Sequence, residues 1–513
     1  MNKVITRIFC LFFAISIAIT ACEGPQGEIG PQGDSGDKGD KGDKGDQGDP
    51  APGEPTEVDL QVRSITPSLV KKLAGFESVE TIPLISSEDQ LTETPNFIYG
   101  GSADGMGLLK TSLGYSLIVN HEDNFSVSRI TFDKAFKPIA GEYILNSNGG
   151  VWRLCSATLA TFEEHGFGPV YITCGESSVE SQTHALNPFG SIAGAAFSKA
   201  IPALGRWNAE NAVPLPKTAY ADRTVIMIGD DDSGASGGQL AMYITDAGRV
   251  GDLNGESGSP SVANASVYAL RRVDLNTREM DLVEGQEVDV EFALIANAKD
   301  IKTMTGAQVN AKATEVTSIA FGRVEDIDYR KGGGANGREI YFNVTGQGDN
   351  SDRTKYGRTY KLVLDAANPL AGKLTLILDG DKEGGKASEY QNVDNIMVTT
   401  NYVYTQEDPN TYGDETHDAY LYQYSIATGE LKKVFELDHK RSDPKFMATQ
   451  TFGNWEYGAF IDISDIIGVE NTFLLNIQPH TWQTDYFRNP DGGSVRPNEK
   501  QGSQTLIIKG LPR

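Results

Sequence analysis

From residue 59 to residue 513 the chain consists of short apolar runs separated by turn-forming residues, and this pattern constrains the fold most. β-Branched and aromatic residues fill the runs, and clusters of Gly, Asp and Asn divide them. Several neighbouring runs read as hairpins, for example RTVIMIG (223–229) with QLAMYIT (239–245) and EIYFNVT (339–345) with YKLVLD (360–365). Regularly spaced short strands predict an all-β sandwich, barrel or propeller. About 450 residues at about 70 per four-stranded blade favour a β-propeller of about six blades, with a few short helices in loops.

Acidic residues stand where many of these runs begin or end. They are Glu122, Glu176, Glu210, Asp230 to Asp232, Glu325, Asp326 and Asp394. In a propeller the innermost strand of each blade has one end at the mouth of the central channel, so single carboxylates from separate blades can meet there. Hard cations such as Ca²⁺ prefer a cluster of oxygen ligands. The sequence therefore predicts a Ca²⁺ site at the propeller axis.

The first residues carry an export signal. Lys3 and Arg7 precede an apolar run (8–18) that is too short to span a membrane, and Cys22 follows the small residues that mark a cleavage site. Residues 1–21 are thus expected to be a lipoprotein signal peptide, with lipid on Cys22. The alternative is an ordinary signal with a chance cysteine. We expect a lipid-anchored protein of the bacterial cell envelope, in the outer membrane, facing the periplasm or the cell surface.

Residues 22–58 form a collagen-like stalk. Glycine occupies every third position from Gly24 to Gly48, as a triple helix requires, and Lys-Gly-Asp recurs within it. A working triple helix would make the protein a homotrimer. The alternative is an extended charged spacer between the lipid anchor and the domain at 59–513.

The net charge of −25 bears on the partners of the protein. No basic patch and no interleaving of basic with aromatic residues occurs, which argues against nucleic acid as a partner. The acidic surface suits a soluble domain and a cation-binding one.

Two cysteines, Cys155 and Cys174, remain in the folded domain. In an oxidising compartment they could form one disulfide. Alternatively, Cys155 could bind a metal as a thiolate. The third possibility is an inert buried thiol, and the spacing of the cysteines does not decide among these interpretations.

Five segments, taken in order, resemble the PhoX-type alkaline phosphatases, which are calcium- and iron-dependent β-propeller enzymes of bacteria. The segments are LIVNHE (117–122), VYITCGE (170–176), LGRWNAE (204–210), IMIGDDD (226–232) and FGRVEDIDY (321–329). With two later segments, VDN (393–395) and LLNIQPH (474–480), the resemblance extends from about Asp104 to Trp482.

The resemblance implies metal-dependent hydrolysis of small phosphate esters by Ca²⁺ and Fe³⁺. The metal ligands that it implies are Asn120, Cys155 (for iron), Glu176, Glu210, Glu325 and Asp394; we predict Glu122, at the end of its strand, as a further ligand. Arg323 would hold the substrate phosphate, and Glu325 would act beside it in catalysis. Clustered metals can neutralise phosphate oxygens and activate an oxygen nucleophile, and a guanidinium matches the geometry of phosphate.

Departures from the family pattern keep two other functions open. Ser156-Ala157-Thr158 follows Cys155 without the usual glycines, and Ala209 replaces the usual histidine. The chain also lacks the twin-arginine signal that is common in the family. It could therefore be a calcium-stabilised binding or adhesive propeller without catalysis. A lactonase-type esterase with a central Ca²⁺ is the other alternative.

Overall fold

The structure is a computed structural model that describes residues 57–246, 265–348 and 350–513. These residues belong to one compact unit, which extends from Gly53 to Arg513. The predicted export signal, Cys22 and nearly all of the predicted stalk lie outside the described residues, so the signal, the lipid anchor, the stalk and the homotrimer stay predictions. None of the described helices is long and apolar enough to cross a membrane.

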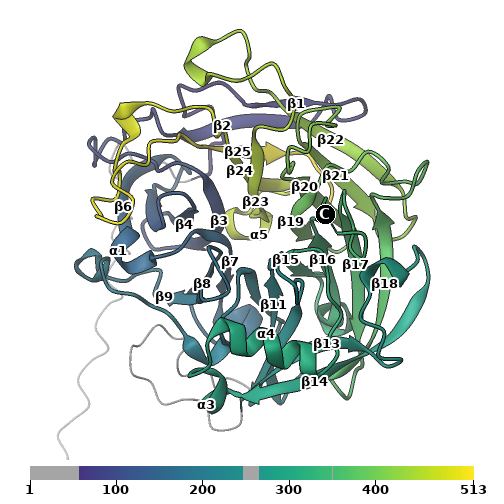
Figure 1. Cartoon of the computed structure of the whole chain (residues 1–513). Coiled ribbons are helices and arrows are strands. Elements are labelled where there is room, and N and C mark those ends of the chain that lie inside the picture. The colour runs from purple at the N-terminus through teal and green to yellow at the C-terminus, as the bar shows by residue number, and fades with distance from the viewer. Residues whose placement is uncertain (1–56, 247–264, 349) are drawn as a thin grey trace, which may run out of the picture. The chain divides into compact units, whose positions relative to one another are not determined.

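The described residues form antiparallel sheets that surround a central axis (Figure 1). The first two sheets contain β3 (Ala103–Lys110), β4 (Tyr115–His121), β5 (Ser126–Phe132) and β6 (Pro138–Leu145), then β7 (Leu154–Ala160), β8 (Val170–Gly175) and β9 (His184–Leu186). The next sheet contains β10 (Ala209–Pro214), β11 (Arg223–Asp230), β12 (Leu240–Asp246), β13 (Ser266–Arg272), β14 (Glu287–Asn297), β15 (Val324–Tyr329), β16 (Glu339–Val344), β17 (Arg358–Leu364) and β18 (Ala371–Asp379). It consists of two four-stranded meanders that β14 joins at their outer edges.

The last two sheets combine strands from both ends of the chain. They contain β1 (Val70–Lys72) with β19 (Val393–Val398), β20 (Tyr402–Glu407), β21 (Tyr420–Ser425) and β22 (Leu431–Leu437), and β2 (Glu80–Ser86) with β23 (Glu456–Asp462), β24 (Thr472–Gln478) and β25 (Gln504–Lys509). Strands β1 and β2 pair with β22 and β25, so the beginning of the domain closes onto its end. This closure covers sheet edges that would otherwise be free to pair with other chains.

In the described part of the chain, helices are few and short. They are α1 (Ser147–Gly150), α2 (Phe162–His165), α3 (Ala298–Ile301), α4 (Gly306–Glu315) and α5 (Ser464–Ile467), with 3₁₀ turns at Ile192–Gly194, Pro202–Leu204, Glu279–Asp281, Gly334–Arg338, Pro444–Phe446 and Asp485–Phe487. The all-β propeller predicted from the sequence is confirmed. The number of blades depends on how the nine-stranded sheet is divided, and division at β14 gives six.

Six inner strands form the wall of the channel. Strands β3, β7, β10, β15, β19 and β23 contact one another in this order, and β23 contacts β3 to close the ring. The hydrophobic core lies between neighbouring sheets. In β11, Ile226 and Ile228 pack toward the sheet of β8, whereas Val225 and Met227 pack toward the sheet of β16. Both faces of such a strand are buried, which explains why the runs are continuously apolar and do not alternate with polar residues.

Each inner strand carries a β-bulge close to its beginning. In each bulge two residues stand opposite one residue of the next strand, at 104–105, 155–156, 210–211, 325–326, 394–395 and 458–459. In five of the six, the first bulged residue is Asp, Cys or Glu. Bulges re-aim side chains and are common beside functional sites. The repeated bulge places one ligand-type side chain per sheet at the same end of the channel.

Amide side chains opposite four of these bulges link neighbouring sheets. Asn476 donates to the carbonyl of Asp104 (2.6 Å), and Asn343 donates to the carbonyls of Asp394 (2.9 Å) and Asn395 (3.1 Å). Gln406 makes the same kind of bond to Gly458 (2.5 Å), and Asn120 makes it to Cys155. Because a buried carbonyl without a partner costs free energy, these amides hold the bulges in place.

Candidate metal centre

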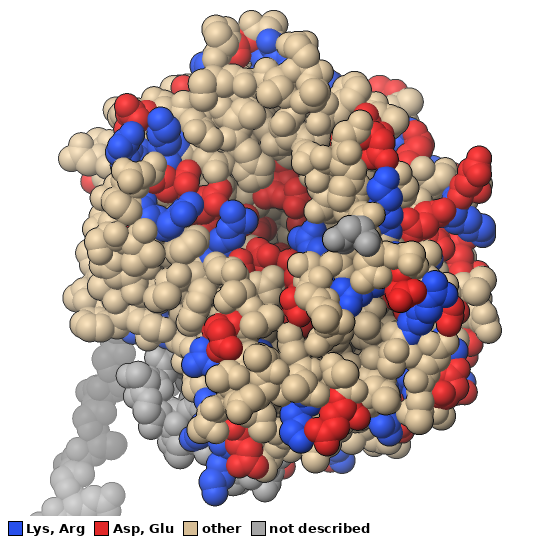
Figure 2. Space-filling view, in the orientation of Figure 1, with Lys and Arg blue, Asp and Glu red and all other residues tan. Residues whose placement is uncertain are grey.

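Nine buried or half-buried side chains gather at one mouth of the channel. They form four overlapping groups: Asp104, Glu122 and Cys155; Cys155, Glu176 and Glu210; Glu210, Glu325 and Asp394; and Asp394, Asp408 and Glu456. Within each group the potential ligand atoms lie within 4.8 Å of one another. Cys155, Glu210 and Asp394 each belong to two groups, so the groups form one continuous cluster, which we call the acidic arc. Figure 2 shows acidic atoms lining the central opening.

Six of the seven predicted metal ligands lie in the acidic arc: Glu122, Cys155, Glu176, Glu210, Glu325 and Asp394. The seventh, Asn120, has other partners. Its amide nitrogen donates to the Cys155 carbonyl and to Thr173 Oγ1 (2.8 Å), and its amide oxygen accepts from Tyr171 (3.0 Å). The structure thus favours a role for Asn120 in supporting the bulge over the predicted role as a ligand.

Three members of the arc were missed in the sequence: Asp104, Asp408 and Glu456. Asp104 is the first bulged residue of β3, Asp408 follows β20, and Glu456 begins β23. The run around Asp104 reads ADGMGLLK, in which two glycines weaken the strand signal. Position near the start of an inner strand was the available signal for Asp104 and Glu456, but it requires knowing which strands are innermost, and Asp408 follows the second strand of its sheet.

Both cysteines are free thiols, so the disulfide alternative is wrong. The Cys155 thiol donates to Glu176 Oε2 (3.2 Å), whereas the Cys174 sulfur lies 3.3 Å from Thr183 Oγ1. Burial, together with the negative charges of Glu122 and Glu210, raises the pKa of Cys155 well above its ordinary value. The thiolate form therefore needs a cation beside it.

We expect peptide-level alkylation to show this state directly. When the protein is unfolded without reductant and treated with iodoacetamide, both the Cys155 and the Cys174 peptides should carry the label, because no bond joins the two sulfurs. Mass spectrometry of the digest measures it. Recovery of a Cys155–Cys174 cross-linked peptide from unreduced protein would overturn the assignment.

The arc is an unfavourable place for negative charge unless cations are present. Burial, followed by the charges of neighbouring carboxylates, raises the pKa of Glu210 to about 8. The same causes raise the pKa values of Asp104 and Asp394 well above the ordinary value. One oxygen of Asp394, Oδ1, is buried and has no hydrogen-bond partner among the described residues.

These donors fit metal ions. Clustered carboxylate oxygens suit a hard cation such as Ca²⁺, and the single thiol suits a transition metal such as iron. A bound cation would also remove the like-charge repulsion within the arc.

Arg323 lies at the rim of the arc, where it was predicted to bind phosphate. Its guanidinium contacts Asp231 Oδ1 (2.6 Å), Glu325 Oε1 (3.0 Å) and Asn410 Oδ1 (2.8 Å), and its side chain is 21 % exposed. Its φ is +74°, in the left-handed region that non-glycine residues seldom adopt. Strain of this kind persists where surrounding contacts enforce it, and it is frequent at functional sites.

An open, polar pocket of about 870 Å³ adjoins Arg323. Glu176, a member of the acidic arc, lines it together with Asp231, Lys355 and Tyr412. Its volume lies within the range of about 300–1,000 Å³ that is typical of sites for small organic molecules. The pocket therefore has room for a molecule larger than a single anion beside the arc.

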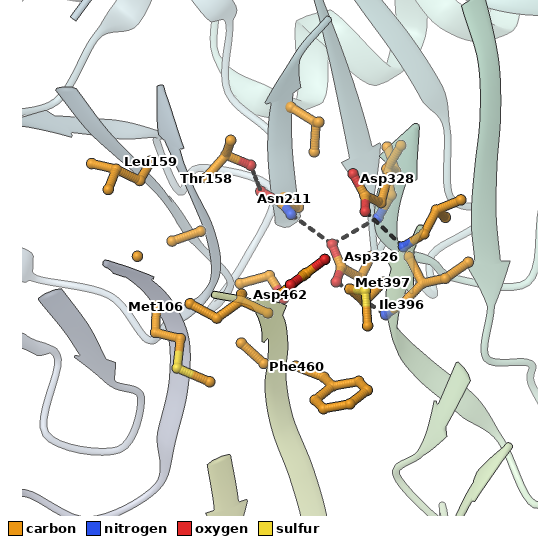
Figure 3. Close-up of a pocket in the computed structure, with 18 of the residues that line it drawn as sticks. Met106, Thr158, Leu159, Asn211, Asp326, Asp328, Ile396, Met397, Phe460 and Asp462 are labelled. Carbon is orange, nitrogen blue, oxygen red and sulfur yellow. Dashed lines mark hydrogen bonds between the residues drawn. The ribbon is translucent and has the colours of Figure 1, made fainter. Parts of the chain in front are cut away.

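A second pocket, of about 260 Å³, is lined by residues of all six inner strands, several of the second bulged residues among them (Figure 3). Here Asp326 accepts hydrogen bonds from Asn211 Nδ2 (2.6 Å) and from the Ile396 amide (3.1 Å). Asp328 accepts one from the Val398 amide (2.8 Å). These carboxylates link neighbouring sheets. The adjacent acids Glu325 and Asp326 thus have different roles: Glu325 belongs to the acidic arc, and Asp326 links strands of the channel wall.

The fold was compared with known proteins. No protein-family model and no curated protein sequence matches this chain. PhoX of Pseudomonas fluorescens, solved in complex with vanadate, is structurally similar with a TM-score of 0.55 at 13 % identity, over 88 % of this chain and 98 % of that one. The fold is PhoX-like. A PQQ-bound aldose sugar dehydrogenase from Streptomyces coelicolor aligns over 84 % of this chain and 98 % of that one, with a TM-score of 0.33 and 11 % identity.

Proposed function

We propose that the protein hydrolyses phosphate monoesters with cations bound in the acidic arc. The observation that carries this proposal is the position of Arg323 between nine clustered Asp, Glu and Cys side chains and a pocket of organic-ligand size. The PhoX structure with this fold holds vanadate, which is described there as a transition-state analogue.

Cations bound in the arc would supply charge neutralisation and an activated oxygen nucleophile. The chain's own residues orient the substrate. Asp231 and Asn410 fix the guanidinium of Arg323 from two sides, so a phosphate oxygen meets a donor that is already in position. Glu325, in contact with Arg323, couples this donor to the arc.

We infer that the organic part of the ester lies in the 870 Å³ pocket. Besides Lys355 and Tyr412, its walls carry the amides of Asn208 and Gln347 and the hydroxyl of Ser233. Such a lining suits a polar alcohol and disfavours a fatty one, because buried polar groups need partners.

Hydrolysis of p-nitrophenyl phosphate tests the proposal. We expect turnover by protein loaded with Ca²⁺ and Fe³⁺, its loss after chelation, and a decrease in kcat/KM of about 100-fold in Arg323→Ala, because a preorganised donor to the developing charge is lost. Arg330→Ala is the matched control, since Arg330 also pairs with a glutamate, Glu339 (3.5 Å).

The outcomes separate the alternatives. Fully loaded protein that hydrolyses no phosphate ester would contradict the proposal. Ca²⁺-dependent thermal stability without turnover would support the binding propeller, and turnover of a lactone in place of phosphate esters would support the esterase.

A further inference from the structure

Arg153 lies at the rim of the acidic arc, close to a different part of it from Arg323. It directly precedes Leu154, the first residue of β7, and its side chain is 48 % exposed. Its Nη1 donates to Glu122 Oε1 (3.1 Å), and its Nη2 lies 3.5 Å from Asp123 Oδ1. Among the residues that the structure describes, this bond to Glu122 is the one hydrogen bond of its guanidinium. Because a guanidinium has five N–H donors, Arg153 retains donors for a ligand.

Glu176 connects the surroundings of the two arginines. Its backbone amide donates to the Arg153 carbonyl (2.9 Å). Its Oε1 accepts from Asn208 Nδ2 (3.3 Å), and the same Asn208 amide donates to the carbonyl of Asp231, the residue that holds Arg323. Glu176, a member of the middle of the arc, is therefore linked to Arg153 directly and to Arg323 through Asn208 and Asp231. In Figure 2, basic side chains are visible on both sides of the red-lined opening.

The charges near Arg153 change when cations enter the arc. Glu122, its main partner, belongs to the group with Asp104 and Cys155. A cation bound by that group would neutralise the charge of Glu122, and the positive charge of Arg153 would then be less compensated. An anion can take the place of the lost partner.

We propose that Arg153 is a second anion-binding residue, which holds the phosphoryl group together with Arg323. The inference rests on the proposed function. In this arrangement, which we call the arginine clamp, the two guanidiniums would bind an anion at the Cys155–Glu176–Glu210 part of the arc from opposite sides. Two guanidinium forks favour a tetrahedral oxyanion with several oxygens over a single carboxylate, because each fork can pair with two oxygens.

Calorimetric titration with inorganic phosphate and with orthovanadate tests this assignment on the metal-loaded protein. For Arg153→Ala we expect the affinity for both anions to be about 10- to 100-fold weaker, which corresponds to the loss of one or two charge-assisted hydrogen bonds. Arg153→Lys keeps the positive charge but not the two-pronged donor, so its affinity for the anions should lie between those of wild type and Arg153→Ala. In turnover, Arg153→Ala should raise KM with kcat changed by about threefold or less, because the contact is present in both ground and transition states.

Two controls accompany the titration. Arg513→Ala removes another arginine that pairs with carboxylates (Asp462, Asp465 and Glu470), at the far end of β23 from Glu456. This variant should bind both anions as wild type does. Metal content, measured by elemental analysis for every variant, separates anion binding from support of the metal centre.

The outcomes are distinct. If Arg153→Ala holds its full metal content and binds phosphate as tightly as wild type, the arginine clamp is wrong and the proposed function still stands. If Arg153→Ala loses metal, but its remaining loaded sites bind phosphate normally, Arg153 has a structural role and the arginine clamp is again wrong. If loaded wild type neither binds nor hydrolyses any phosphate compound, the proposed function fails, and the clamp fails with it. If wild type binds phosphate but hydrolyses no ester, the Arg153→Ala titration still decides the arginine clamp: weaker phosphate binding supports it, and unchanged binding contradicts it.

Discussion

Glu210→Gln should abolish most of the bound metal and lower phosphate-ester hydrolysis about a thousandfold or more. Glu210 belongs to two of the four groups in the acidic arc, with Cys155 and Glu176 on one side and Glu325 and Asp394 on the other. Its loss therefore weakens two neighbouring metal positions. Bound metal contributes several kcal/mol to the stabilisation of transition-state charge, and each 1.36 kcal/mol corresponds to tenfold in rate.

Elemental analysis and p-nitrophenyl phosphate hydrolysis, measured on the same preparation, check this expectation. Glu315→Gln is the matched control, because Glu315 pairs with Lys312 on the exposed surface of α4 and takes no part in the arc. Glutamine nearly preserves the size of the side chain, so the fold should survive. Full metal content with near-normal rates in Glu210→Gln would show that the arc is not the catalytic centre.

Much of the fold could be predicted because strand pairing here is local. The hairpins read from the sequence at 223–245 and 339–365 are present as β11–β12 and β16–β17. Turn residues between two apolar runs specify such pairs directly. The pairing of β2 with β25 joins segments more than 400 residues apart, and no local signal specifies it.

The candidate site was predicted where a carboxylate follows or opens an obvious strand. Glu176 and Glu210 are of this kind, and both lie in the arc. The bulges were not predictable, because an extra residue in a strand depends on the partner strand and leaves no pattern of its own. For that reason Asp104 was missed, and the amide of Asn120, which is opposite the first bulge, was interpreted as a ligand.

Adjacent residues in a bulge can have unrelated roles, and Glu325 and Asp326 show this. In a regular strand, neighbours point to opposite faces of a sheet. At the bulge of β15, Glu325 joins the arc, and Asp326 accepts a hydrogen bond from the backbone amide of Ile396 in the next inner strand. A pair of acids in a sequence therefore does not indicate two ligands.

The metal-free protein should become less stable as pH rises, and bound cations should reverse this trend. The pKa of Glu210 in the folded, metal-free protein is about 8, against an ordinary value of 4.5. Between these two pH values the folded state holds a proton that the unfolded state has released. Unfolding is then coupled to proton loss, so the free energy of unfolding falls with rising pH and levels off above about pH 8.

Differential scanning calorimetry of chelator-treated protein at pH 5.5 and pH 8.5 measures the effect. We expect Tm to be lower at pH 8.5 by about 3 °C or more, since the proton on Glu210 counts 1.36 kcal/mol per pH unit over about 2.5 units and a domain of this size shifts by about 1 °C per kcal/mol. With saturating Ca²⁺ the difference should change sign, because protons compete with the cation for the same oxygens and are fewer at high pH. Glu210→Gln has no such proton to lose, so its metal-free Tm should depend less on pH than that of wild type. A metal-free Tm that rises from pH 5.5 to pH 8.5 would mean that the carboxylates of the arc are hydrated or paired when ionised, and the physical reason for placing cations there would be lost.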